Sequence, residues 1–359
     1  MQRLIELDGL RGLACLMVLV AHYFGEVPHG LGWLLGGWVG VSLFFCLSGF
    51  LIGGILIDSR DSPTFFSSFY IRRSFRIFPV YYLVVCAVIA AVVLTKDSGW
   101  TDPALPPAVY FTYTQNIALS VTGDQRSLWL LPTWTLALEE QFYILLPLLI
   151  GHVSRRHLVK FILALVLSAT LFRLTLFVTH AEHVAVLVTR WDMLLMGVLA
   201  AIGYRQIWPR LIERNARLLQ IAAVGGVILT LALAVIGKFD NNTSFEILGP
   251  LTAAVGCTGY MLFVISEGKR FHSKWLRYIG SISYGLYLIH QPINGLLHGV
   301  ILGTRPDVET LSQIGVTVTA MTLSMLLAGL SWRLFERPLV GYGHQLSERR
   351  MARLRPGII

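Results

Sequence analysis

Three ionisable residues stand in or beside the first apolar stretch of the chain: Asp8, Arg11 and His22. The eleven residues from Arg11 to His22 make very nearly three helical turns, so both side chains face the same way, about 16 Å apart along the axis. Asp8 precedes Arg11 by one turn on nearly the same face. A lone histidine in a helix is more often a packing residue, but ionisable groups inside an apolar span are costly and indicate function. We therefore predict that His22 acts as a general base or proton relay.

Two arginines, Arg73 and Arg76, stand in the basic segment 58–77. On a helix, residues three apart share a face. The pair can be a positive anchor that keeps this segment in the cytoplasm. It can also be an anion site for a phosphorylated ligand, because the planar guanidinium suits phosphate.

Two adjacent carboxylates, Glu139 and Glu140, lie near the start of an apolar stretch that begins at Trp134. Both can reach interfacial water, with Trp134 and Tyr143 in an aromatic belt. Neighbouring residues on a helix point about 100° apart, so we expect one carboxylate to enter a cavity. Glu139 shares a face with Tyr143. In a functional interpretation, this group contacts the substrate, and Glu139 orients the imidazole of His22 or holds the acceptor.

Two further pairs of polar residues occur in apolar stretches. Arg190 and Asp192 are near neighbours of opposite charge, which predicts an ion pair that fixes helix packing. Tyr287 and His290, three apart, precede Pro292, which bends a helix. Structural hydrogen bonding is the default interpretation of Tyr287 and His290, and a contact with substrate in the cavity is the alternative.

The composition indicates that membrane helices position these residues. Hydrophobic residues make up 55% of the 359 residues and charged residues 14%, against about 25% charged residues in soluble domains. A span needs about 20 apolar residues. We predict an all-α integral membrane protein with about ten transmembrane helices, near residues 10–25, 33–57, 78–94, 134–150, 158–178, 184–203, 218–236, 246–265, 276–302 and 312–332.

The positive charges alternate between the two sides of this arrangement. Of the 29 lysines and arginines, 22 fall in the N-terminus, the tail and alternate connections, and four fall in the others. Positive charge stays on the cytoplasmic side, so both termini are predicted to be cytoplasmic. Topology thus explains the net charge of +9 without a nucleic-acid partner. We predict a transmembrane domain over 1–340 and a basic cytoplasmic tail over 341–359.

The long external connection 95–133 contains Pro103, Pro106, Pro107 and an aromatic run from Tyr110 to Tyr113. Loops of this length are usually functional or disordered, and this one is too aromatic for a disordered linker. We expect it to fold back against the bundle, either as the roof of a cavity or as simple packing.

Several of these motifs, in this order, resemble the membrane acyltransferase family called acyltransferase-3, which contains bacterial O-acetyltransferases of surface polysaccharides and related glycans. The resemblance covers residues 4 to about 340. It rests on Leu7-Asp8-Gly9-Leu10-Arg11-Gly12 followed by His22, on Arg73-x-x-Arg76, on Trp134-x-Leu-x-x-Glu139-Glu140-x-Phe-Tyr143, on Arg190-x-Asp192 with Gly197, on Ser283-Tyr-Gly to His290-x-Pro292, and on Phe335-Glu336-Arg337-Pro338.

The resemblance implies about ten helices in the bacterial inner membrane and acetyl-coenzyme A (acetyl-CoA) as a cytosolic co-substrate. The family's essential Arg–x10–His pair corresponds to Arg11 and His22. Its basic pair corresponds to Arg73 and Arg76, and its Trp–Glu motif to Trp134 and Glu139. No permanently bound cofactor is implied, and no metal is expected, because no second histidine or cysteine stands at ligand spacing near His22.

We therefore expect the arginines to hold the phosphates of CoA while His22 takes the proton of an acceptor hydroxyl. The acceptor is a carbohydrate or glycolipid whose identity stays open, as do a longer acyl donor and the oligomeric state. The residues expected to contact the substrates are Asp8, Trp134, Glu140, Tyr143, Tyr287 and His290. The rival hypothesis is an exporter of a lipid-linked glycan, although transporters often show internal repeats and none is visible here.

Overall fold

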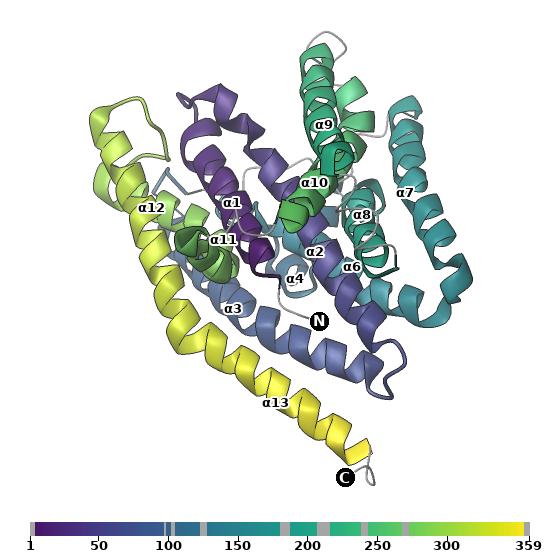
Figure 1. The fold of residues 1–359 in the computed structure, drawn as a ribbon. Coiled ribbons are helices and arrows are strands. Elements are labelled where there is room, and N and C mark those ends of the chain that lie inside the picture. The colour runs from purple at the N-terminus through teal and green to yellow at the C-terminus, as the bar shows by residue number, and fades with distance from the viewer. Residues whose placement is uncertain are drawn as a thin grey trace.

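The computed structural model describes residues 4–96, 98–101, 105–122, 128–179, 187–206, 216–237, 243–267 and 273–354 (Figure 1). Within these ranges every regular element is a helix and no strand occurs. Several of these helices are long and apolar enough to cross a membrane. The chain is an all-α integral membrane protein, as the sequence predicted.

In chain order the elements are α1 (Ile5–Val20), η1 (Ala21–Gly25), η2 (Gly32–Gly37), α2 (Trp38–Ser59), α3 (Phe65–Thr95), α4 (Pro107–Phe111), α5 (Gln115–Thr122), α6 (Thr133–His152), α7 (Arg155–Val178), α8 (Leu187–Gln206), α9 (Ala216–Gly237), α10 (Thr243–Glu267), α11 (Lys274–Leu302), α12 (Leu311–Ser331), η5 (Trp332–Glu336) and α13 (Arg337–Leu354). The segments η1 and η5 are π-helical, and each continues the α-helix before it. A π-turn inside an α-helix is often found at a functional site.

All ten predicted spans overlap a helix, but the count by length and apolar composition is eight among the described residues. The two helices left out are α6 and α11. Both carry polar residues that lower their hydropathy: α6 carries Glu139 and Glu140, and α11 carries His290, Asn294 and His298. Both helices that fall outside the count thus hold candidate site residues.

The surface of the bundle is apolar where lipid would surround it. Helices α7 and α9 present rows of exposed aliphatic side chains, including Leu163, Leu167, Leu171, Leu218, Ile221, Val224 and Ile228. Such rows would be unfavourable in water and are favourable in hydrocarbon.

Helices α1 and α11, which carry the candidate histidines, approach one another closely at two glycines. A Cβ atom at Gly12 would overlap the carbonyl oxygen of Leu276, and one at Gly280 would overlap that of Asp8. Small residues allow helix backbones to touch in this way inside membranes. The contact fixes α1 against α11 and so determines which of their side chains meet.

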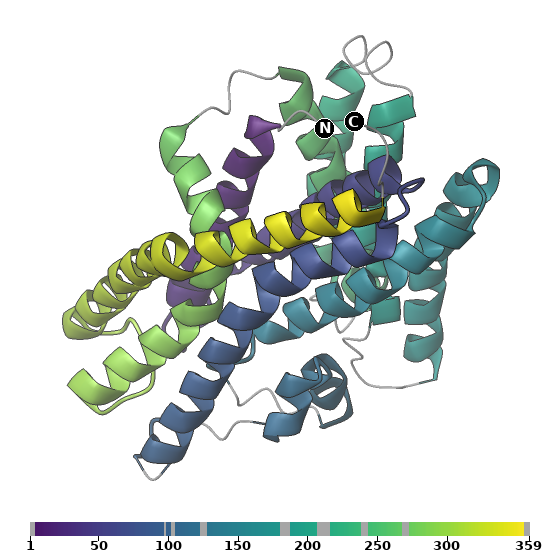
Figure 2. The same cartoon turned by 90° about the horizontal axis from the view of Figure 1, so that it is seen from below.

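Helix α3 is 31 residues long, about 46 Å, and its first half contains Arg73 and Arg76 in helical conformation, as predicted. Helix α13 lies along this half (Figure 2). Arg72 donates from Nε to Ser347 Oγ at 2.9 Å, and the rings of Phe75 and Tyr342 are 5.3 Å apart. The predicted boundary between the transmembrane domain (1–340) and the cytoplasmic tail (341–359) falls within α13.

The external connection folds back against the bundle, as predicted, through α4 and α5. Tyr81 donates its hydroxyl hydrogen to the carbonyl oxygen of Tyr110 at 3.0 Å, and Gln115 donates from Nε2 to the carbonyl oxygen of Thr133 at 2.9 Å. Pro103 lies outside the described residues. These contacts fix the connection over the ends of α3 and α6.

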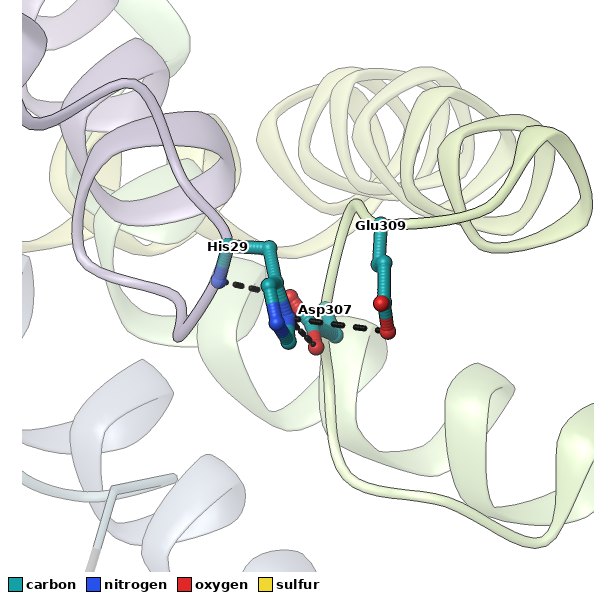
Figure 3. Close-up of side chains that lie close together, drawn as sticks. All are labelled: His29, Asp307 and Glu309. Atoms are coloured by element: carbon teal, nitrogen blue, oxygen red, sulfur yellow. Dashed lines mark hydrogen bonds and ion pairs between the residues drawn. The ribbon is translucent and has the colours of Figure 1, made fainter.

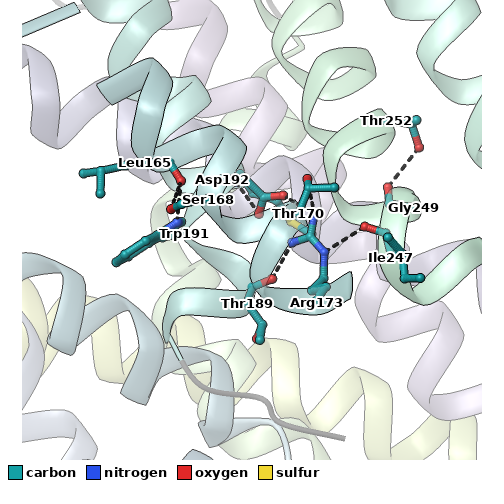
Figure 4. Close-up of polar contacts among 11 residues, drawn as sticks. Leu165, Ser168, Thr170, Arg173, Thr189, Trp191, Asp192, Ile247, Gly249 and Thr252 are labelled. Atoms are coloured by element: carbon teal, nitrogen blue, oxygen red, sulfur yellow. Dashed lines mark hydrogen bonds and ion pairs between the residues drawn. The ribbon is translucent and has the colours of Figure 1, made fainter. Parts of the chain in front are cut away.

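The sequence predicted an ion pair between Arg190 and Asp192, but the structure pairs Asp192 with a different arginine. Asp192 is fully buried and binds Arg173 of α7, whose Nη2 donates to Oδ2 at 2.8 Å (Figure 4). Arg173 also donates to the carbonyl oxygens of Thr189 at 2.6 Å and Ile247 at 2.8 Å. One guanidinium therefore joins α7, α8 and α10. Residues two apart on a helix point in different directions, which is why Arg190 does not take this place.

Candidate active site

His22 lies in the π-helical segment η1, where α1 leaves the bundle. Its Nδ1 is 2.7 Å from Nε2 of His290 in α11, and the two rings are nearly coplanar, at 10°. His22 is 14% exposed at its side chain, whereas His290 is fully buried. The structure thus brings together two histidines that are 268 positions apart in the sequence.

The hydrogen bonds of this pair determine where its protons lie. Nδ1 of His290 is 2.7 Å from the carbonyl oxygen of Tyr287, which can only accept, so this nitrogen carries a hydrogen. In a neutral ring Nε2 of His290 is then an acceptor, and Nδ1 of His22 must donate to it. The remaining nitrogen of His22, Nε2, keeps its lone pair. A neutral His22 in this setting is arranged as a proton acceptor.

Tyrosines from two helices hold this pair in place. Tyr23 is fully buried and donates its hydroxyl hydrogen to the carbonyl oxygen of His290 at 3.0 Å, and it lies 2.9 Å from Ser324 Oγ of α12. Tyr287 donates to the carbonyl oxygen of Pro132 at 3.1 Å and lies 2.9 Å from Thr135 Oγ1 of α6. These bonds tie His290, the partner of the His22 ring, to η1, α6 and α12.

His22 opens onto a cavity of about 620 Å³. Tryptophans dominate its wall: Trp38, Trp100, Trp129 and Trp134. The polar residues Glu26, Thr135, Tyr287, Gln291 and Arg305 also line it. Ligand sites are concave, largely apolar and aromatic, with a few placed polar groups, and this cavity has that character. It also confirms that the connection before α6 contributes to the roof of a cavity.

The indole rings of Trp100 and Trp129 occupy spaces left by two glycines of α11. Their ring centres are 6.1 Å apart, with the rings at 27°. A Cβ atom at Gly295 would overlap the ring of Trp129, and one at Gly299 would overlap that of Trp100. The absence of side chains on α11 thus lets two tryptophans lie against the helix and form part of the cavity wall.

Glu26 is a site residue that the sequence argument missed. Its Oε2 lies 3.6 Å from Nε2 of His22, and burial raises the pKa of its carboxyl group. Glu26 follows His22 by four residues, so the same spacing rule that joined Asp8 to Arg11 could have found it. A carboxylate at this distance stabilises the imidazolium that forms when His22 accepts a proton.

The arginines gather at the other end of α1. Arg11 donates from Nη2 to Ser283 Oγ of α11 at 3.3 Å. The guanidinium of Arg73 lies 5.1 Å from the ring centre of Tyr143. Arg11, Arg73 and Arg76 are within electrostatic reach of one another, and Asp8 is within reach of Arg11. Three like charges at one place indicate a site for an anion.

Glu139 belongs to this arginine cluster rather than to His22. Its carboxyl group lies beside Ser48 and Tyr143, whose hydroxyl groups bond to each other, and it interacts with Arg73 and Arg11. The place beside His22 that the sequence argument offered to Glu139 is taken by His290. Glu140 is buried and also interacts with Arg73. Trp134 precedes Glu139 by about one and a half turns of α6 and lines the cavity.

Arg11 and His22 both bond to α11, so the shared face predicted from their spacing is present in the structure. The residues that bond to Arg11 and His22, Ser283 and His290, both lie on α11. The site therefore has two ends, an arginine cluster and a histidine pair in a cavity, connected by α1 and α11.

One group within the described residues has the composition of a metal site: His29, Asp307 and Glu309 (Figure 3). Nδ1 of His29 is 2.7 Å from Oδ2 of Asp307 and 3.8 Å from Oε2 of Glu309, and the His29 backbone N–H donates to Asp307 at 3.0 Å. Their neighbours Pro28 and Pro306 line the cavity. These contacts join two loops at the cavity rim as hydrogen bonds and ion pairs, which explains them without a metal.

This rim contact should make stability depend on pH. The hydrogen bond that His29 donates to Asp307, and then the charges of Asp307 and Glu309, raise the pKa of His29 above its ordinary 6.5. A raised pKa in the folded state means that the contribution is complete below pH 6.5 and is lost as the pH rises through the folded value. The melting temperature of Asp307→Asn should fall below that of the wild type at pH 6, with a smaller difference at pH 9.

Glu309→Gln is the control for this prediction, because Glu309 is farther from His29 and should show the weaker trend. Equal differences at both pH values for Asp307→Asn would contradict an ionised His29.

Comparison with known proteins places this geometry in a family. The sequence profile of a family described as an acyltransferase domain matches residues 4–332. Similar proteins include the "Peptidoglycan O-acetyltransferase OatA" of Listeria monocytogenes serovar 1/2a, 28% identical over 93% of this chain and 55% of that protein. The "O-acetyltransferase OatA" of Staphylococcus aureus (strain NCTC 8325) is 28% identical over 93% of this chain and 56% of its own length. The chain spans about half the length of these curated relatives, and no solved structure matches it.

Proposed function

This chain belongs to the acyltransferase domain family, and from that premise we propose that it is a membrane O-acetyltransferase that moves an acetyl group from acetyl-CoA to a hydroxyl group of a glycan. The observation that carries the proposal is the His22–His290 pair, which opens onto a tryptophan-lined cavity while the same two helices also hold the arginine cluster.

The proposed acetyl transfer depends on Nε2 of His22, which carries no hydrogen and can accept a proton. The acceptor hydroxyl gives its proton to Nε2 while its oxygen attacks the carbonyl carbon of the thioester. His290 keeps the bond to Nδ1–H, and the carboxylate of Glu26 faces the imidazolium. The carbon–sulfur bond then breaks, and the leaving thiolate takes the proton from Nε2. The products are an acetyl ester and free CoA, and His22 returns to its first state.

The arginine cluster is the proposed donor end. Arg11, Arg73 and Arg76 bind the phosphates of CoA at the cytosolic face, because guanidinium groups bind phosphate through paired hydrogen bonds. The pantetheine arm then follows α1 for about three turns, or 16 Å, towards His22. The positions of the arginines relative to one another are fixed by their interactions with Glu139, Tyr143 and Asp8.

The cavity is the proposed acceptor end. Its volume of about 620 Å³ falls in the usual range for ligand sites, roughly 300–1,000 Å³. Flat indole rings pack against the apolar faces of sugar rings, and Gln291, Thr135 and Glu26 provide hydrogen bonds. The relatives that are named for peptidoglycan acetylation support a polymer of amino sugars as the first acceptor to test.

The decisive experiment uses the purified chain in proteoliposomes with acetyl-CoA labelled in the acetyl group and a chitooligosaccharide as acceptor. We expect free CoA thiol to appear in step with labelled oligosaccharide, and both to require acceptor and donor together. Movement of oligosaccharide across the vesicle membrane without thiol release would instead identify an exporter and end the proposal.

A further inference from the structure

Three consecutive residues of α11 contact three other elements: Ser283 contacts α1, Tyr284 contacts α3 and Gly285 contacts η5. Ser283 Oγ accepts a hydrogen bond from Arg11 Nη2 at 3.3 Å and donates to the carbonyl oxygen of Gly280 at 3.0 Å. Tyr284 donates its hydroxyl hydrogen to the carbonyl oxygen of Ile77 at 2.9 Å. Ile77 directly follows Arg76, so this bond fixes α3 where the Arg76 side chain leaves it.

Gly285 makes room for a buried carboxylate. Glu336 stands in the π-helical segment η5 and is 3% exposed. Its Oε1 accepts a hydrogen bond from Ser331 Oγ at 2.9 Å. A Cβ atom at position 285 would lie 2.6 Å from the same oxygen, so any larger residue at this position would displace the carboxylate.

The buried carboxylate of Glu336 interacts with a cation of the donor end. Arg76 is the charged group within its electrostatic reach, and Arg76 in turn is close to Arg11 and Arg73. Buried charges are stable only when they are paired and hydrogen-bonded. A carboxylate within electrostatic reach of Arg76 offsets part of the repulsion among three cations.

We propose that Ser283, Tyr284, Gly285 and Glu336 are positioning residues that hold Arg11 and Arg76 in the orientation that binds the phosphates of the acyl donor. This inference rests on the proposed function. We call these four residues the bracket. None of them takes part in proton transfer, and they act by holding two arginines from α1 and α3 against α11.

The bracket is not explained by packing alone, because Ser283 bonds to Arg11 and Tyr284 bonds to Ile77, the residue that follows Arg76. Ser281, two residues before Ser283 and about half a turn away on α11, offers a comparison. It is half-buried and its hydroxyl donates only to the carbonyl oxygen of Tyr278, at 2.7 Å, with no arginine involved.

The test compares two acyl donors, acetyl-CoA and S-acetylpantetheine, which carries the same thioester without phosphates. In Ser283→Ala, Gly285→Ala and Glu336→Ala, KM for acetyl-CoA should rise about tenfold, the size of a lost hydrogen bond to a charged group. Neither kcat nor KM for S-acetylpantetheine should change by more than about twofold on the same argument. Ser281→Ala should match the wild type with both donors.

A double substitution tests the contact between Gly285 and Glu336 directly. Gly285→Ala acts by displacing the carboxylate, so adding it to Glu336→Ala should raise KM no further. If Glu336→Ala fails to fold, Glu336→Gln replaces it, because the amide keeps the bond to Ser331 and removes the charge.

Multiplied effects in the double variant, or equal changes with both donors, would overturn the bracket. The same holds if the variants show wild-type KM for acetyl-CoA. A wild-type chain that releases no thiol from acetyl-CoA would instead reject the proposed function, so the two failures are distinguishable.

Discussion

Replacing His22 by alanine should lower acetyl transfer by about 10²–10⁴-fold, the usual contribution of a general base, in protein that folds normally. Nε2 of His22 is the nitrogen left bare by the hydrogen bonds to His290 and faces the cavity. The measurement is the rate of acceptor-dependent thiol release at saturating acetyl-CoA, with His152→Ala as an exposed histidine control.

His290 should behave as a positioning residue in the same assay. His290→Ala removes the acceptor for Nδ1–H of His22 and leaves its ring free to rotate, so kcat should fall by less than in His22→Ala. His290→Gln offers an amide oxygen to the same N–H and should recover part of the rate. Undiminished transfer in His22→Ala would exclude the general base, and equal rates in the two His290 variants would exclude orientation through this bond.

Removing Arg173 should destabilise the fold by about 3–5 kcal/mol, the effect of leaving a buried charge without its partner. Asp192 is fully buried, and Arg173 joins α7, α8 and α10 through one guanidinium (Figure 4). Arg173→Ala therefore leaves the buried carboxylate of Asp192 without its cation and removes a donor from two carbonyl oxygens. The measurement is unfolding of the detergent-solubilised protein by heat or denaturant.

Arg155 provides the control for Arg173. It pairs with Asp61 at 2.6 Å, but both side chains are exposed, and surface pairs contribute about 0–1 kcal/mol. Comparable losses in Arg155→Ala and Arg173→Ala would contradict a special role for the buried pair. The double variant Arg173→Met/Asp192→Leu should recover much of the loss, because it removes both charges.

The sequence located the helices well because lipid imposes a length and an apolar composition on each of them. It was less accurate where helices extend beyond that requirement. The arginines 73 and 76, assigned to a connection over 58–77, lie inside α3, which begins at Phe65. Hydropathy cannot mark this start, because the first half of α3 is polar and its helical state depends on packing against α13.

The candidate site was predictable where it depends on one helix and not where it depends on two. Helical periodicity correctly placed Arg11 and His22 on a shared face. It could not reveal that His290, 268 positions away, is the partner of His22. The same limit explains the error at Asp192, because its partner is Arg173 of another helix and not its chain neighbour Arg190. Glu139 was expected to orient the imidazole of His22 or to hold the acceptor, whereas packing places it with the arginines.

The π-helical segment η1 has a consequence for how this chain tolerates changes in length. A π-turn holds one residue more than an α-turn, so deleting one residue between Ala21 and Gly25 would let the helix close into ordinary α geometry. A one-residue deletion in an ordinary α-helical turn rotates everything after it by about 100° around the axis, whereas a deletion inside η1 removes the extra residue and leaves the orientation of the following residues largely unchanged. A first helix that is one residue shorter within this segment should therefore still present its two ends in the same relative orientation.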